Sequence, residues 1–155
     1  MDVLAALGKW PGAVLLQQNG TAYLLVNASH ILGIALLIGA ILPLDLRLLG
    51  FFRSVPVATL APVLSRMAGI GLGLALVTGA WLFTVRPVEY ARNAAFLWKL
   101  GLLALALANI ALHHRSAAYA RALAGDVTAA VRWHALASVT LWPGVLLAGR
   151  WIGFL

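Results

Sequence analysis

Residues 27–50, NASHILGIALLIGAILPLDLRLLG, decide the fold that the sequence predicts. Polar residues stand at both ends of this stretch, with Asn27 and His30 near its start and Asp45 and Arg47 near its end. The apolar run between them is long enough to cross a bilayer core of about 30 Å as a helix. A polar side chain in hydrocarbon is costly unless it is hydrogen-bonded, so His30 needs a partner on a nearby element.

The composition is that of a membrane protein. Of the 155 residues, 63% are hydrophobic and 10% are charged, whereas soluble domains carry roughly 25% charged residues. We expect an all-α transmembrane four-helix bundle, one integral membrane domain over residues 1–155, with Pro43 bending or ending its first helix just before Asp45. The expected spans are about 21–44, 62–84, 94–114 and 131–149.

The first 18 residues are too short and too interrupted to span a membrane. Gly8, Pro11 and Gly12 break the apolar run, and Trp10 is typical of the membrane interface. We therefore expect a short interfacial N-terminal helix. Asp2 stands where a signal peptide would carry basic residues, so we expect this segment to be retained.

The charges favour a lipid environment over nucleic acid. The chain carries 11 Lys and Arg, 4 Asp and Glu, and no Cys, for a net charge of +7. The absence of cysteine excludes thiolate metal sites. The cations flank the apolar runs, where lipid headgroups and topology selection explain them, so we expect the lipid bilayer as a partner and no nucleic acid. Their slight excess on the Arg47 side favours external termini.

Small residues recur at four-residue spacing in the second span. Gly69 and Gly73 form one such pair, and Ala75 and Gly79 form another. This spacing lets a second helix approach closely. We interpret both pairs as packing sites inside the bundle, with homodimerisation as the alternative.

Depth along the spans separates the polar residues into two groups. With a helical rise of about 1.5 Å per residue, His30 and Lys99 lie at similar depths near the side that carries the termini. The group on the terminal side contains Asn27, His30, Lys99 and Arg150. The group on the opposite side contains Asp45, Arg47, Asn109, His113 and His134.

The structural interpretation is that these residues only lock the helices together. His30 would then bond Asn27, Ser29 or a carbonyl across the bundle, and Lys99 would extend to the lipid headgroups. Asp45 and Arg47 would form an ion pair that closes the bundle.

The functional interpretation is a cofactor or proton site. Imidazole is a common axial ligand of haem iron, and bundles hold haem between facing helices. His113 and His134 lie at similar depth and could hold one haem as a pair. His30 could ligate another if the second axial position were Lys99, water or empty.

Four segments carry a resemblance to a known family. They are HILGIALLIGAILPLDLRLLG, YARNAAFLWKL, ALANIALHH and SVTLWPGVLLAGRWIGF. In this order they resemble a family of small bacterial four-span membrane proteins of uncharacterised function, which implies a multi-pass protein of the bacterial inner membrane. An acidic residue often stands in that family where this chain has Asn27, and His134 lies outside the family pattern.

A more distant similarity implies more chemistry. The first-span His30, the exit Leu44 to Leu48, and Trp98, Lys99 and Leu100 followed by His113 resemble the membrane protoporphyrinogen oxidases. That resemblance implies haem b, with His30 as the metal ligand and Lys99 as its partner or as a cation for a propionate. The general layout is also similar to copper-resistance membrane proteins, but the Met and His clusters that soft copper requires are missing.

Three hypotheses follow, and the sequence leaves open whether the protein is an enzyme. The leading one is a haem- or tetrapyrrole-binding redox module whose site contains His30, Lys99 and Asn27, with His113 as a secondary candidate. The second is a non-catalytic subunit or assembly factor that joins other membrane subunits or a second copy. In that case Asp45, Arg47, Asn109 and Arg150 form a structural polar cluster. The third is a proton or small-ion pathway between the two groups.

Overall fold

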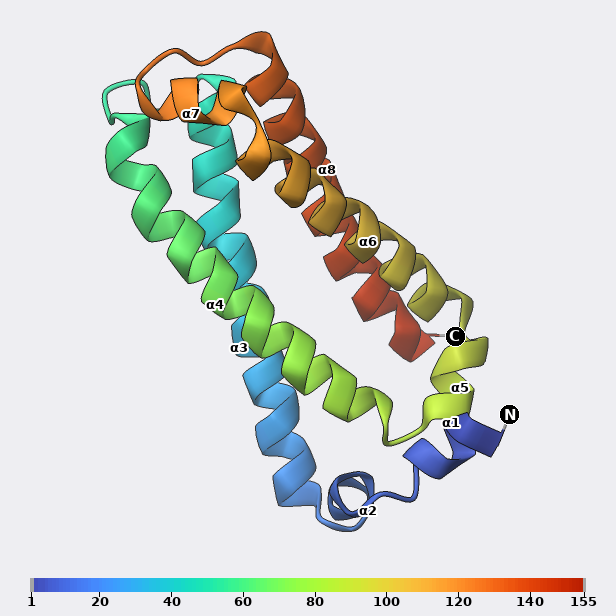
Figure 1. Ribbon diagram of the computed structural model, residues 1–155. Helices are drawn as coiled ribbons and strands as arrows, with labels where there is room; N and C mark the ends of the chain where they lie inside the picture. Colours follow the sequence, from blue (N-terminus) through green and yellow to red (C-terminus); the bar gives the residue numbers. More distant parts are fainter. Residues whose placement is uncertain (1, 155) are drawn as a thin grey trace.

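The computed structural model describes residues 2–154, and this part of the chain is helical and contains no strand (Figure 1). The all-α fold expected from the sequence is confirmed. The elements in chain order are α1 (Asp2–Leu7), α2 (Pro11–Gln18), α3 (Gly20–Leu49), α4 (Val57–Phe83), α5 (Pro87–Arg92), α6 (Ala94–Arg115), α7 (Ala117–Leu123), α8 (Ala129–Trp151) and the 3-10 turn η1 (Ile152–Phe154).

Four of these helices, α3, α4, α6 and α8, are long and apolar enough to cross a membrane. The chain is therefore a multi-pass membrane protein whose spanning helices contact lipid. The helices extend beyond the expected spans. In particular, α3 continues past residue 44 to Leu49, and α4 begins before residue 62, at Val57.

Pro43 was expected to bend or end the first helix just before Asp45, and it does not end the helix. α3 passes through Pro43 and ends at Gly50, whose φ of 109° is readily adopted by glycine. A proline removes one helical hydrogen bond, a loss that membrane helices tolerate when neighbouring elements support them. Leu44 and Leu48 are buried among residues of α4, α7 and α8, so packing holds the last turns of α3 in place.

The bundle consists of two helical hairpins. α3 packs chiefly against α4, α6 packs chiefly against α8, and a contact between α3 and α8 joins the two pairs (Figure 1). The α3–α4 contact is closest at Gly33 and Gly71. A Cβ atom on Gly33 would lie 2.7 Å from the Ala75 nitrogen, and one on Gly71 would lie 2.5 Å from the Leu37 nitrogen. Glycine is therefore required at both positions.

The small-residue prediction is correct for one pair and wrong for the other. Ala75 and Gly79 lie on the face of α4 that meets α3, whereas no atom lies within 4 Å of a Cβ built on Gly69 or Gly73. Positions 69 and 73 lie half a turn away from Gly71, so they point out of the bundle.

The buried apolar residues form two clusters. One, around Leu37, Ala106 and Trp142, lies where α3, α4, α6 and α8 meet. The other, around Leu48 and Val131, lies nearer α7. Neither cluster reaches the end of the bundle that carries His30 and Lys99, where Ala13, Leu16 and Ala95 are buried and the rings of Phe83 and Phe96 stack.

Short helices cover the two ends of the bundle. α1 and α2 lie at the end that carries the C-terminus (Figure 1), where Trp81 of α4 donates through Nε1 to the Gly12 carbonyl at 2.9 Å. Gln17 donates to the carbonyls of Gly8 and Val85, each at 3.0 Å. The connections between the long helices also contain short helices, α5 between α4 and α6 and α7 between α6 and α8.

Candidate functional site

His30 on α3 is held by Thr78 on α4. The distance from His30 Nδ1 to Thr78 Oγ1 is 3.1 Å, and the Thr78 hydroxyl donates its own proton to the Leu74 carbonyl at 2.6 Å. Because the hydroxyl proton is already used, Oγ1 accepts a hydrogen bond from Nδ1–H of His30. The neutral imidazole then carries its lone pair on Nε2.

The His30 ring also rests on Gly79. A Cβ atom on Gly79 would lie 2.9 Å from His30 Cε1, which is closer than carbon atoms normally pack. Gly79 therefore leaves the space that the imidazole occupies. Together, Thr78 and Gly79 fix both the tautomer and the position of the ring.

Lys99 on α6 approaches this site from the second hairpin. Its side chain lies against Gly149 of α8, with Nζ 3.6 Å from the position of a Cβ on that glycine. Lys99 lies in the second turn of α6 and His30 in the first half of α3. His30 and Lys99 are thus brought to the same end of the bundle, as their depths predicted.

The other two residues expected in this group are placed differently. Asn27 is half-buried, and its side chain makes no hydrogen bond within residues 2–154. The Arg150 guanidinium is exposed and lies 5.1 Å from the centre of the Phe154 ring, a cation–π contact outside the bundle. The hydroxyl of Ser29 donates to the Leu25 carbonyl at 2.8 Å and is not the partner of His30.

The second group gathers around a small cavity between α3, α6, α7 and α8. The cavity has a volume of about 20 Å³. Its polar lining comes from Asp45, Asn109, His113, His114, Tyr119, His134 and Ser138. Asp45 and His113 are 4% and 8% exposed, respectively. Asp45 Oδ2, both ring nitrogens of His113 and the Ser138 hydroxyl are buried without a hydrogen-bond partner.

Asn109 makes two hydrogen bonds to His134 at the edge of this cavity. Asn109 Nδ2 donates to the His134 carbonyl at 3.0 Å, and its Oδ1 lies 2.7 Å from His134 Nδ1. The His113 ring lies 5.2 Å from the His134 ring and 4.6 Å from the Tyr119 ring, measured between centroids. The predicted neighbourhood of Asp45, Asn109, His113 and His134 is therefore present.

The expected haem pair of His113 and His134 does not fit this geometry. Their rings are in direct contact, and the cavity beside them is about 20 Å³, whereas pockets for organic ligands measure about 300–1,000 Å³. A porphyrin cannot pass between the two imidazoles as they are arranged.

The expected ion pair of Asp45 and Arg47 is also absent within residues 2–154. Arg47 donates through Nε to the Val55 carbonyl of the following loop. Residues two apart on a helix point in nearly opposite directions, so Arg47 faces the loop while Asp45 faces the bundle. Arg86 and Glu89 form an exposed ion pair at 3.2 Å, at the other end of the bundle.

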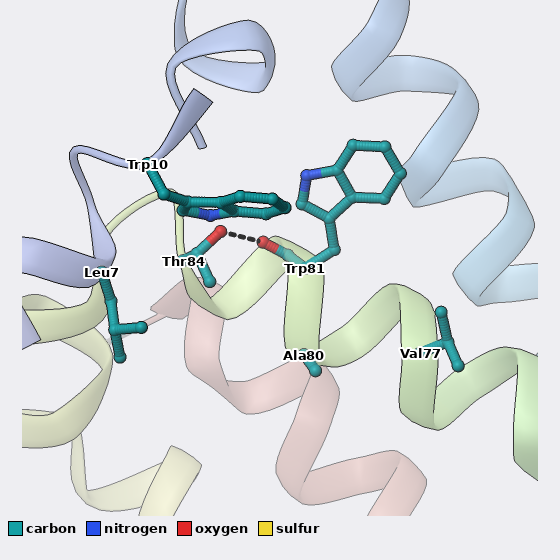
Figure 2. A pocket seen from close by; sticks show the side chains of 6 residues that line it. All are labelled: Leu7, Trp10, Val77, Ala80, Trp81 and Thr84. Carbon is teal, nitrogen blue, oxygen red and sulfur yellow. Dashed lines mark hydrogen bonds between the residues drawn. The ribbon is translucent and has the colours of Figure 1, made fainter. Parts of the chain in front are cut away.

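A larger groove lies on the outer face of α4 (Figure 2). It has a volume of about 420 Å³ and is lined by Leu7, Trp10, Val77, Ala80, Trp81 and Thr84. Figure 2 shows Trp10 and Trp81 close together, and their ring centroids are 6.5 Å apart. His30 does not line this groove or the smaller cavity.

The described residues contain no group of three or more His, Cys, Asp or Glu side chains arranged to hold a metal ion. A metal site with protein ligands alone is thus unsupported here. A metal ion that is already bound by a porphyrin needs only one or two further ligands from the protein.

Sequence reasoning did not assign a role to Thr78, Ser138 or Tyr119, and it assigned Gly79 only to helix packing. The available signal was a hydroxyl residue in an apolar stretch, namely Thr78 in α4 and Ser138, two residues before Thr140, in α8. To predict what these hydroxyls face, one must know how each helix is rotated about its axis. A helix that is apolar on all sides gives no sequence signal for that rotation.

Comparison with protein-family models matches residues 6–155 to DUF6644, described as a family of unknown function. No curated protein and no solved structure is a significant match to the chain.

Proposed function

The chain belongs to the DUF6644 family of unknown function, and we propose that it is a haem- or tetrapyrrole-binding redox module in the inner membrane of a bacterium. His30 is the proposed ligand of the metal, and Lys99 is the proposed partner for an anionic group of the macrocycle. The observation that carries the proposal is the hydrogen bond that sets the His30 tautomer.

Metal-binding histidines almost always donate their other ring N–H to a fixed acceptor, which orients the ring and makes the ligating nitrogen more basic. The Thr78 hydroxyl provides such an acceptor, because its own proton is bound to the Leu74 carbonyl. The His30 ring also packs directly against Gly79. The free Nε2 atom is therefore held in one orientation before any ligand arrives.

Lys99 supplies a positive charge at the same end of the bundle. Its aliphatic chain packs against Gly149, and its ammonium interacts electrostatically with the His30 site. A cation in the membrane without a protein anion is costly, and no carboxylate within residues 2–154 forms an ion pair with Lys99. The propionate of a haem would provide the missing anion.

The packing of the bundle is compatible with a ligand at this end. Both buried apolar clusters lie away from His30 and Lys99. His30 is only half-buried, and under this proposal a flat apolar macrocycle would reach its Nε2 from between the hairpins. Haem held there would supply one-electron chemistry, while the chain itself supplies the ligand, the counter-charge and an apolar setting.

Titration with haemin tests this proposal. The full chain in mild detergent should bind haemin with a saturable change in the Soret band, and His30→Ala should lose that change. His114→Ala is the matched control, because His114 is an exposed histidine on α6 that makes only a local contact with the Ile110 carbonyl. Equal binding by all three proteins would contradict the role of His30.

The second candidate is a non-catalytic subunit in which His30 only joins α3 to α4. It is favoured by the same hydrogen bond, which already satisfies one nitrogen of His30, and by the tight glycine contacts next to it. Under this alternative His30→Ala lowers the stability of the bundle and the wild type stays colourless with haemin.

A further inference from the structure

The cavity between α3, α6, α7 and α8 contains polar groups that the proposed haem site does not use. Asp45, His113 and Ser138 are all more than nine-tenths buried, and each has an atom without a hydrogen-bond partner. An unsatisfied polar atom costs about 1–3 kcal/mol in such surroundings. Three unsatisfied side chains around one cavity indicate that something polar fills it.

The size of the cavity limits what can fill it. Its volume of about 20 Å³ exceeds the roughly 10–15 Å³ that one water molecule needs. It is far too small for an organic ligand, and the described residues offer no set of three metal ligands. One water molecule fits, with Asp45, His113 and Ser138 as its hydrogen-bonding partners.

We propose that this cavity is a binding site for one proton, shared through a single water molecule between Asp45 on α3 and His113 on α6. Uptake of the proton converts the Asp45 carboxylate into a neutral carboxylic acid whose new O–H bond forms at the unpartnered Oδ2. No other covalent bond changes. Ser138 on α8 faces the same carboxyl group and completes the site.

The charged surroundings favour the neutral, proton-bound form. The groups that face the cavity from the other helices are Asn109, His113 and His114 of α6, Tyr119 of α7, and His134 and Ser138 of α8. α4 contributes no side chain to the lining, and Arg47 of α3 is bound to the Val55 carbonyl. No permanent cation therefore compensates an Asp45 carboxylate, which would be costly in an apolar bundle.

A series of ring contacts leads from the cavity to the exposed end of α6. The His113 ring contacts Tyr119 at 4.6 Å and His114 at 5.7 Å, and His114 contacts Tyr119 at 4.8 Å between centroids. His114 is exposed at the end of α6. The proton would exchange through these residues with water on the Arg47 side of the membrane.

Infrared spectroscopy of the full chain in lipid bilayers tests this site. At neutral pH the protein should show the C=O stretch of a protonated carboxylic acid, shifted to lower frequency in D₂O. Asp45→Asn should abolish the band. Asp126→Asn is the matched control and should leave it unchanged, because Asp126 is exposed.

Isotope labelling keeps the test decisive if Asp45→Asn fails to fold. The chain has four acidic residues, of which three are aspartates. In the Asp126→Asn background, ¹³C-labelled aspartate therefore marks the two remaining aspartates and leaves the glutamate unlabelled. If the acid band comes from an aspartate, it should shift in the spectrum of the folded protein. The sharing of the proton is tested by His113→Gln and Ser138→Ala, which should each shift the band, with His114→Gln as control. A spectrum without the acid band, or a band that neither substitution moves, would overturn the proposal.

Discussion

The hydroxyl of Thr78 accepts a hydrogen bond from Nδ1 of His30 across the α3–α4 interface at 3.1 Å. Because the hydroxyl proton is bound to the Leu74 carbonyl at 2.6 Å, the direction of this bond is set by helix α4 itself. The bond keeps the Nε2 atom of His30 unprotonated in the neutral ring. Changing either Thr78 or the space around the His30 ring should therefore have a measurable effect.

Replacing the Thr78 hydroxyl should weaken the proposed haem site without removing the ligand. Thr78→Val keeps the shape of the side chain but leaves Nδ1 of His30 without its acceptor. Loss of such a partner typically costs about 10–100-fold in metal affinity, so haemin titration should show a weaker site in this range. Thr140→Val, which removes a hydroxyl bonded only to its own helix, should bind as tightly as the wild type.

Filling the space beneath the His30 ring should act on the same site by a different route. A methyl group at position 79 would lie 2.9 Å from His30 Cε1 and displace the imidazole. Gly79→Ala should therefore weaken haemin binding several-fold and shift the Soret band. Gly73→Ala, on the same helix with nothing within 4 Å, should change neither quantity. A wild-type spectrum for Gly79→Ala would mean that the ring position does not matter.

The glycines of α4 should differ sharply in their effect on stability. Gly71→Ala places a methyl group 2.5 Å from the Leu37 nitrogen, and such overpacking costs about 1–3 kcal/mol. Gly69→Ala meets no neighbour, so the better helix propensity of alanine should leave stability unchanged or slightly raised. Denaturant titration followed by circular dichroism measures both. Equal destabilisation by the two variants would contradict the helix orientation described here.

Asn109 should contribute to the α6–α8 contact through both ends of its amide. Asn109→Leu removes the hydrogen bonds to the His134 carbonyl and to His134 Nδ1. Hydrogen bonds between membrane helices are worth about 1–2 kcal/mol, and the free energy of unfolding should fall by that order. Asn27→Leu, studied without added cofactor, removes an amide that makes no hydrogen bond in the described part of the chain, so its unfolding should match the wild type.

The sequence was sufficient for the fold because the apolar runs are long and separated by polar connections. It was also sufficient to place His30 with Lys99, and His113 with His134, since a constant helical rise converts residue number into depth. The end of α3 was misjudged because Pro43 is a strong helix breaker in soluble proteins and a tolerated residue here.

Helix rotation was the information that the sequence lacked. The helices are apolar on most sides, because lipid and protein interior have similar polarity, so the buried face has no clear signature. For this reason Gly69 and Gly73 were assigned to the interior when they point out. The pairing of His30 with Thr78 and the placement of Asp45 and Ser138 around one cavity depend on the same rotations and were not predicted.

The most direct test of the proposed function is the absorbance spectrum of the protein purified in mild detergent from haem-replete cells, recorded oxidised and then reduced with dithionite. The account predicts a Soret band and sharpened bands on reduction, both lost in His30→Ala and retained in His114→Ala. A wild-type protein that is colourless as purified, and stays colourless when haemin is added, would contradict it.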